Sequence, residues 1–126
     1  MNRLGRWGPV VLLMGLIFYF SSLPDPGRLP AGVSDKSAHF WTYALLGALW
    51  FRALAGGRIA GVTAARVIVA ATAAALYGLS DEIHQMFVPG RSPEALDVAA
   101  DTAGGFVGAA LAAAIARWLR RTLPRD

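Results

Sequence analysis

The residues best suited to chemistry gather in one short segment, residues 77–91, at the end of a long apolar run. This segment brings together two carboxylates, an imidazole, a carboxamide and a guanidinium, which belong to Asp81, Glu82, His84, Gln85 and Arg91. At about 100° per residue on a helix, Gln85 falls between the two acids, and His84 lies on the far side of Asp81. Such groups are costly beside hydrocarbon unless they pair or bind something. Two adjacent acids can also serve as a general acid and a general base if their surroundings differ.

A second polar group opens the apolar segment 35–54. It consists of Asp35, Lys36, His39 and Tyr43, which share an arc of about 100° on a helical wheel. Leu46 and Trp50 continue the same stripe. Asp35 and Lys36 could simply cap the helix among lipid headgroups. His39 together with Tyr43 is better explained by a helix face that points into a bundle, where polar side chains of membrane spans usually lie.

A third group lies on one face of the segment 93–118. Its members are Asp97, Asp101, Gly104, Gly105 and Gly108. The spacing Gly104-x-x-x-Gly108 lets another helix approach closely, so the two carboxylates are expected on the packing face. Ser92-Pro93 predicts an N-cap followed by proline at the first helical position. Ser34 predicts a similar cap for the segment 35–54.

The composition indicates the class of protein that these groups belong to. Of 126 residues, 56% are hydrophobic and 16% charged, and the mean hydropathy is +0.47. This is too apolar for an ordinary soluble domain and is typical of several membrane spans. We therefore predict an all-α, polytopic membrane protein, a single domain over residues 1–126. Four transmembrane helices are expected, at about 7–23, 35–54, 67–88 and 93–118.

The first of these segments has a second interpretation. Arg3 and Arg6 precede its apolar run and Ser21-Ser22 follows it, as in a cleaved signal peptide. The three further hydrophobic segments favour a first span that is retained in the membrane.

Charge is divided between the two ends of the predicted bundle. Nine of the 12 basic residues fall at one end: Arg3, Arg6, Arg52, Arg58, Arg66, Arg117, Arg120, Arg121 and Arg125. By the positive-inside rule this end, with both termini, is cytoplasmic. The other end receives seven of the eight acids together with Arg28, Lys36 and Arg91. The net charge of +4 thus indicates topology rather than nucleic-acid binding, because the basic residues flank apolar segments.

Other chemistries receive less support from the sequence. The chain has no cysteine and therefore no thiolate ligand or nucleophile. Neither His-x-x-x-His nor Glu-x-x-His occurs, so we predict no metal site and no cofactor. Ser80 lies beside Asp81 but in no nucleophile-elbow motif.

Three blocks of residues resemble the signature of the VanZ-like membrane protein family. They are Asp35-Lys36-x-x-His39-Phe40-x-x-Tyr43, Ser80-Asp81-Glu82-x-x-Gln85-x-Phe87-x-Pro89-Gly90-Arg91 and Asp97-x-x-x-Asp101-x-x-Gly104-x-x-x-Gly108. The order and spacing match over about residues 21–110. Asp101 departs from the family pattern, which often has Asn there, and adds a possible negative charge.

The resemblance implies a small four-helix protein of the bacterial cytoplasmic membrane. The family takes its name from a member associated with teicoplanin resistance, and the resemblance implies no particular reaction.

Three functions remain open from the residues themselves. The first is a binding site for an envelope lipid or a glycopeptide-type ligand. The second is an enzyme that acts on a lipid-linked envelope substrate, with no catalytic residue assigned. The third is a structural cluster that locks the helices together. In each case the same residues carry the role: Asp35, Lys36, His39, Tyr43, Asp81, Glu82, Gln85, Arg91, Asp97 and Asp101. Membrane lipids or an envelope ligand are the expected partners, and the oligomeric state is left open.

Overall fold

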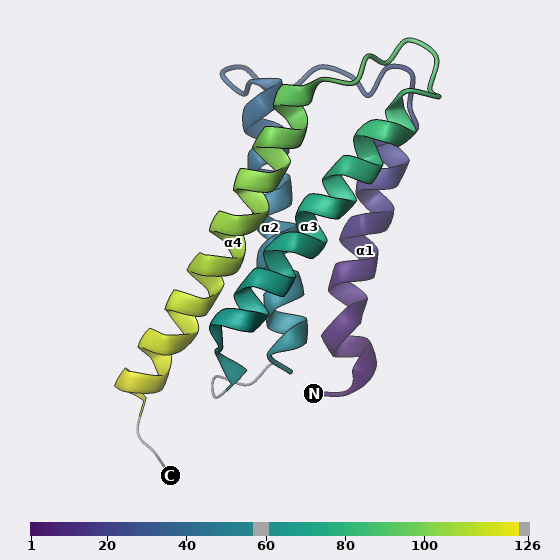
Figure 1. Ribbon diagram of the computed structural model, residues 1–126. Helices are drawn as coiled ribbons and strands as arrows, with labels where there is room; N and C mark the ends of the chain where they lie inside the picture. Colours follow the sequence, from purple (N-terminus) through teal and green to yellow (C-terminus); the bar gives the residue numbers. More distant parts are fainter. Residues whose placement is uncertain (57–60, 124–126) are drawn as a thin grey trace.

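The computed structural model describes residues 1–56 and 61–123 (Figure 1). These residues form four helices and no strand: α1 (Arg3–Ser21), α2 (Asp35–Leu54), α3 (Ala64–Gln85) and α4 (Ala95–Thr122). Figure 1 shows the start of α1 and the end of α4 at one end of the bundle, and the two loops that follow α1 and α3 at the other. The predicted all-α fold of four helices is confirmed.

Local capping explains where three of the helices begin. Ser34 accepts the backbone N–H of Ser37 at 3.1 Å, so α2 has the predicted cap and covers the predicted residues. Asn2 caps α1 by accepting the N–H of Gly5 at 2.8 Å, which starts that helix at Arg3 rather than at residue 7. Thr63 does the same for α3, which begins at Ala64 rather than at residue 67.

The start of α4 differs from its prediction. The helix begins at Ala95, Glu94 occupies the N-cap position, and the Glu94 side chain makes no capping hydrogen bond. Instead, the carboxylate of Glu82 in α3 accepts the backbone N–H of Glu94 at 3.0 Å. The predicted cap at Ser92-Pro93 is therefore wrong, because a side chain from another helix provides the acceptor.

Among the described residues, three helices are long and apolar enough to cross a membrane: α1, α3 and α4. The prediction of four such spans is wrong for α2. This helix contacts all three others and turns His39 and Tyr43 toward them. Polar side chains on its inner face and Arg52 in its last turn lower its hydropathy. Its position inside the bundle thus explains its less apolar sequence.

Glycine brings α2 and α4 into backbone contact. A Cβ at Gly104 would overlap the carbonyl oxygen of Phe40, and one at Gly108 would overlap that of Ala44. Gly47 of α2 faces the backbone of Gly105 in the same way. The predicted glycine face of α4 is therefore its packing face, and side chains larger than hydrogen are excluded along it.

The buried face of α3 leads directly into the polar cluster. It runs through Ala70, Ala71, Ala74 and Gly78, and then through Asp81, Glu82 and Gln85. These positions recur at helical spacing, so the polar residues occupy the same interior stripe as the alanines. The cluster consequently lies at the end of the bundle opposite the start of α1.

The basic end of the bundle is formed as expected where the structure describes it. Arg3 and Arg6 lie in the first turns of α1, Arg52 in the last turn of α2, and Arg120 and Arg121 in the last turn of α4. Arg58 and Arg125, which were predicted at the same end, lie outside the described residues.

Candidate functional site

A cavity of about 700 Å³ opens between α1, α2 and α3, beneath the loop that joins α1 to α2. One wall is apolar and comes from α1: Leu13, Leu16, Ile17 and Phe20. The rest includes six of the ten predicted site residues: Asp35, His39, Tyr43, Asp81, Gln85 and Arg91. The other four, Lys36, Glu82, Asp97 and Asp101, are not part of its lining. The cavity thus joins an apolar wall to a polar one.

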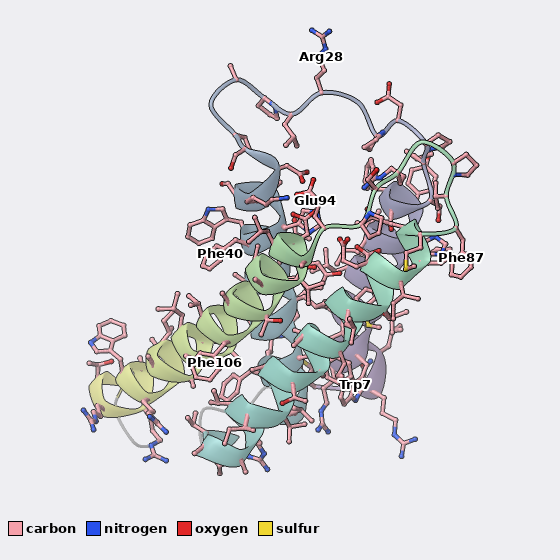
Figure 2. All side chains as sticks on the ribbon, turned by 45° about the horizontal axis from the view of Figure 1, so that its top comes forward. Trp7, Arg28, Phe40, Phe87, Glu94 and Phe106 are labelled. Atoms are coloured by element: carbon pink, nitrogen blue, oxygen red, sulfur yellow. The ribbon has the colours of Figure 1, made fainter. Side chains whose placement is uncertain are left out.

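Lys36 links the start of α2 to the start of α4. Its ammonium group donates to the buried carboxylate of Asp97 and, at 2.5 Å, to the carboxylate of Glu94. Figure 2 shows Glu94 at the end of α4 that faces the polar loops. The neighbouring ammonium lowers the pKa of the Glu94 carboxyl below its usual range. Asp35 lies 3.7 Å from the same ammonium, so one lysine meets three acids.

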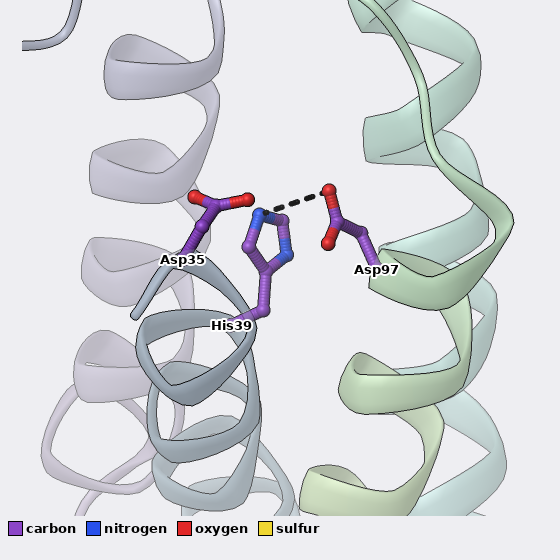
Figure 3. Close-up of side chains that lie close together, drawn as sticks. All are labelled: Asp35, His39 and Asp97. Atoms are coloured by element: carbon purple, nitrogen blue, oxygen red, sulfur yellow. Dashed lines mark ion pairs between the residues drawn. The ribbon is translucent and has the colours of Figure 1, made fainter. Parts of the chain in front are cut away.

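His39 lies between two carboxylates of α4. Its Nε2 is 3.7 Å from Oδ2 of Asp97, the ion pair drawn in Figure 3. Its Nδ1 is 2.8 Å from Oδ1 of Asp101. Asp101 is fully buried and packs against Gly78 of α3, where an added Cβ would lie 2.7 Å from the Asp101 Cβ. The imidazole is therefore held from both sides, and Asp101 fits only because residue 78 is glycine.

Arg91, Gln85 and Asp81 form a polar row along the cavity. Arg91 donates to the Gln85 side-chain oxygen at 3.0 Å and to the carbonyl of Leu23 at 3.4 Å. The Gln85 amide lies 3.5 Å from Oδ2 of Asp81, which is a long contact. Within residues 1–56 and 61–123, Arg91 has no carboxylate partner.

This pairing differs from the one expected for a structural cluster. A structural cluster would pair the buried Asp81 with a cation such as Lys36 or Arg91. Instead, Lys36 binds Asp97 and Glu94, and Arg91 binds Gln85. His84 lies outside the cluster, because its Nε2 is 3.0 Å from the Ser22 hydroxyl and its ring packs on Phe18.

The residues at this site that were not predicted as part of it include three with polar side chains, Arg28, Thr42 and Glu94. Arg28 and Thr42 line the cavity, and Figure 2 shows Arg28 on the loop above the helices. Glu94 could have been found, since it lies three residues before Asp97 and thus one helical turn away. Neither Arg28, on its proline-rich loop, nor Thr42 carries a comparable signal.

Comparison with known proteins supports the resemblance found in the three sequence blocks. The model of the VanZ/LLP1 family matches residues 7–117, which include all ten predicted site residues. No curated protein and no solved structure matches the chain. Since the family match extends over most of the 126 residues, the chain belongs to the VanZ/LLP1 family.

Proposed function

We propose that this chain binds an envelope lipid, or a glycopeptide-type ligand with similar groups, at the extracytoplasmic end of its helix bundle. The observation that carries this proposal is the cavity of about 700 Å³, in which the apolar wall of α1 faces Asp81, Gln85 and Arg91. A cavity of this size lies within the range of small-molecule sites, about 300–1,000 Å³. An amphiphile has the matching division into an apolar chain and a polar headgroup.

Arg91 is the group that would hold an anionic headgroup. A guanidinium binds phosphate or carboxylate through two parallel hydrogen bonds. Here it is oriented by Gln85 and the Leu23 carbonyl, which leaves its charge uncompensated within the described residues. Asp81 and Asp35 would accept hydrogen bonds from hydroxyl or amide groups farther along the headgroup.

A purely structural role accounts for only part of the cluster. Lys36 with Asp97 and His39 with Asp101 join α2 to α4, and such pairs hold helices together. In the row of Arg91, Gln85 and Asp81 the amide lies between the two charges, which form no direct ion pair. The row lines a cavity instead, which favours binding.

The alternative function is an enzyme that acts on a lipid-linked envelope substrate. In that reaction Asp81 and Glu82 would serve as acid and base. Asp81 lines the cavity, whereas Glu82 turns toward the start of α4 and is not part of the lining. The geometry therefore supports binding better than catalysis by this pair.

The same proposal includes the topology. The helix bundle of this single domain would lie in the bacterial cytoplasmic membrane, with both termini in the cytoplasm. The arginines at the start of α1 and the end of α4 support this orientation through the positive-inside rule. The cavity then opens near the outer leaflet, where an envelope ligand is available. Binding there would lower susceptibility to teicoplanin, the property from which the family takes its name.

Lipid retention by the purified protein tests the proposal. The parent, placed in nanodiscs of mixed phosphatidylglycerol and phosphatidylcholine, is extracted into detergent and its bound lipid is measured by native mass spectrometry. We expect retention of the anionic lipid, and about a tenfold or greater loss of affinity in Arg91→Gln, because one charge-assisted hydrogen bond contributes about 1.5–3 kcal/mol.

Arg52→Gln is the matched control, since Arg52 lies at the opposite end of the bundle and bonds the Gly5 carbonyl. Equal lipid retention by the parent and by Arg91→Gln would refute the proposed site.

A further inference from the structure

Two deeply buried carboxylates in the cluster have an oxygen with no hydrogen-bond partner. They are Glu82, which is 4% exposed, and Asp101, which is 0% exposed. The unpartnered atoms are Oε1 of Glu82 and Oδ2 of Asp101. A buried carboxylate oxygen without a donor is costly, so each of these two groups is expected to bind a further atom.

The charges around these groups do not balance. Four carboxylates are buried at this end: Asp81, Glu82, Asp97 and Asp101. Among the described side chains, Lys36 pairs with Asp97 and His39 with Asp101, while Arg91 is bonded to Gln85. Buried acids without a cation are strongly disfavoured. The excess of negative charge in the cluster therefore favours the binding of one further cation.

Three helices bring suitable ligand atoms together at this point. His39 of α2, Glu82 of α3 and Asp101 of α4 each offer one ligand atom, and all three atoms lie within 4.8 Å of one another. A zinc ion binds nitrogen and oxygen ligands at about 2.0–2.2 Å in a tetrahedral arrangement, which places neighbouring ligand atoms about 3.3–3.6 Å apart. Side-chain movements of at most about 1.5 Å would bring the three ligand atoms to these separations.

We propose that His39, Glu82 and Asp101 bind a divalent cation of the Zn²⁺ or Mn²⁺ class. One imidazole and two carboxylates suit these ions, whereas Ca²⁺ and Mg²⁺ prefer ligand sets made of oxygen alone. The ion would replace the proton shared by His39 Nδ1 and Asp101 Oδ1. Sequence reasoning disfavoured a metal because each helix supplies a single ligand, which leaves no local spacing motif.

The groups behind the imidazole support this assignment. Metal-bound histidines usually donate their second ring N–H to a carboxylate. Here Nε2 of His39 faces Asp97, which Lys36 holds in place through its ammonium group. A second grouping, Asp35 with His39 and Asp97, also brings its ligand atoms within 4.8 Å. It is the weaker site, because the Lys36 ammonium already occupies the Asp97 carboxylate and Asp35 is exposed.

Metal binding to the full chain in detergent tests the proposal without any lipid, so it can fail separately from the proposed function. The protein is treated with EDTA, dialysed, and titrated with Zn²⁺ and with Mn²⁺ by calorimetry; bound metal is then counted by mass spectrometry. We expect one equivalent in the parent and an affinity at least about tenfold lower in Glu82→Gln and in Asp101→Asn. Both substitutions preserve side-chain shape, and circular dichroism verifies that the helices persist.

His84→Ala is the matched control, because His84 is the other histidine of the chain and bonds Ser22 outside the cluster. The metal affinity of His84→Ala should equal that of the parent. A dissociation constant above about 1 mM for both ions in the parent would overturn the proposal. So would equal affinity in the parent and in a folded Glu82→Gln, or a loss that occurs only in Asp35→Asn.

Discussion

The carboxylate of Glu82, near the end of α3, accepts the backbone N–H of Glu94 at 3.0 Å, immediately before α4 begins. This bond satisfies one of the backbone donors that every helix start leaves without a partner in its own helix. It also fixes the end of the loop that carries Arg91. The loop that carries Arg91, which lines the cavity, and the start of α4 are therefore held by one side chain.

Removal of this acceptor is expected to destabilise the protein. In metal-free protein, Glu82→Ala should lower the free energy of unfolding by about 1–2 kcal/mol, as the loss of a helix cap does. Glu82→Gln keeps a side-chain oxygen that can accept the same N–H and should lose less. Thermal unfolding in detergent, followed by circular dichroism, provides the comparison. Identical losses in the two variants would show that the bond has no stabilising role.

The backbone contact between α2 and α4 predicts a strong effect of one methyl group. Gly108→Ala places a Cβ against the Ala44 carbonyl and should cost about 1–3 kcal/mol through overpacking. Gly15→Ala in α1 is the control, because no atom lies within 4 Å of the added Cβ. The glycine helix interface would be refuted by equal thermal stability of the two variants.

Asp81 and Asp97 are expected to respond differently to the same change. Asp97→Asn removes the charge that pairs with Lys36, so the variant should accumulate poorly in the membrane. Asp81 pairs with no cation among the described residues, so Asp81→Asn breaks no ion pair. This variant should accumulate like the parent, while its lipid retention falls. Fluorescence of a fused reporter measures accumulation. Poor accumulation of Asp81→Asn would favour the structural role of the cluster.

The pair of Glu94 and Lys36 is expected to make a small, pH-dependent contribution to the stability of the protein. Lys36 lowers the pKa of Glu94 in the folded protein. The stabilisation by ionised Glu94 is therefore full above the usual carboxyl pKa, and it disappears as the pH falls through the lowered pKa. The difference in melting temperature between the parent and Glu94→Gln should therefore shrink from about pH 7 to about pH 3. Salt should shrink it too, since the pair is partly exposed. A difference that grows toward low pH would contradict this account.

The proposed topology is testable because the chain contains no cysteine. Val33→Cys, in the exposed loop before α2, should react with an impermeant maleimide added to intact cells. Thr122→Cys, at the other end of the bundle, should react only after the cells are opened. The reverse pattern would place the cavity on the cytoplasmic side and exclude an extracellular ligand.

Helical periodicity was sufficient to place the polar residues on their correct faces. Asp81, Glu82 and Gln85 follow the alanine stripe of α3, and Asp97 and Asp101 precede the glycine stripe of α4. Periodicity does not state which residue of a neighbouring helix each side chain meets, because that depends on the rotation and depth of both helices. The partners of Lys36 and Arg91 therefore required the structure.

The wall of the cavity and the role of α2 could not be predicted for related reasons. An apolar helix such as α1 has the same composition whether its side chains face lipid or a cavity, so Leu13 and Leu16 carried no signal. For α2, the apolar character of residues 35–54 in a strongly apolar chain suggested a span. Its lower hydropathy reflects its position among three other helices, a tertiary fact that no local pattern contains.

The apolar wall of the cavity comes from α1, whereas the helices that meet through glycine are α2 and α4. α2 and α4 meet backbone to backbone at Gly104 and Gly108, so their separation cannot adjust without loss of the fold. α1 contributes side chains to the cavity, and among the described residues no hydrogen bond links these side chains to Asp81, Gln85 or Arg91. Under the proposed lipid-binding function, a change at Leu13 or Leu16 would alter the space for an acyl chain and leave the headgroup contacts in place. Selection for a different lipid would then act on α1.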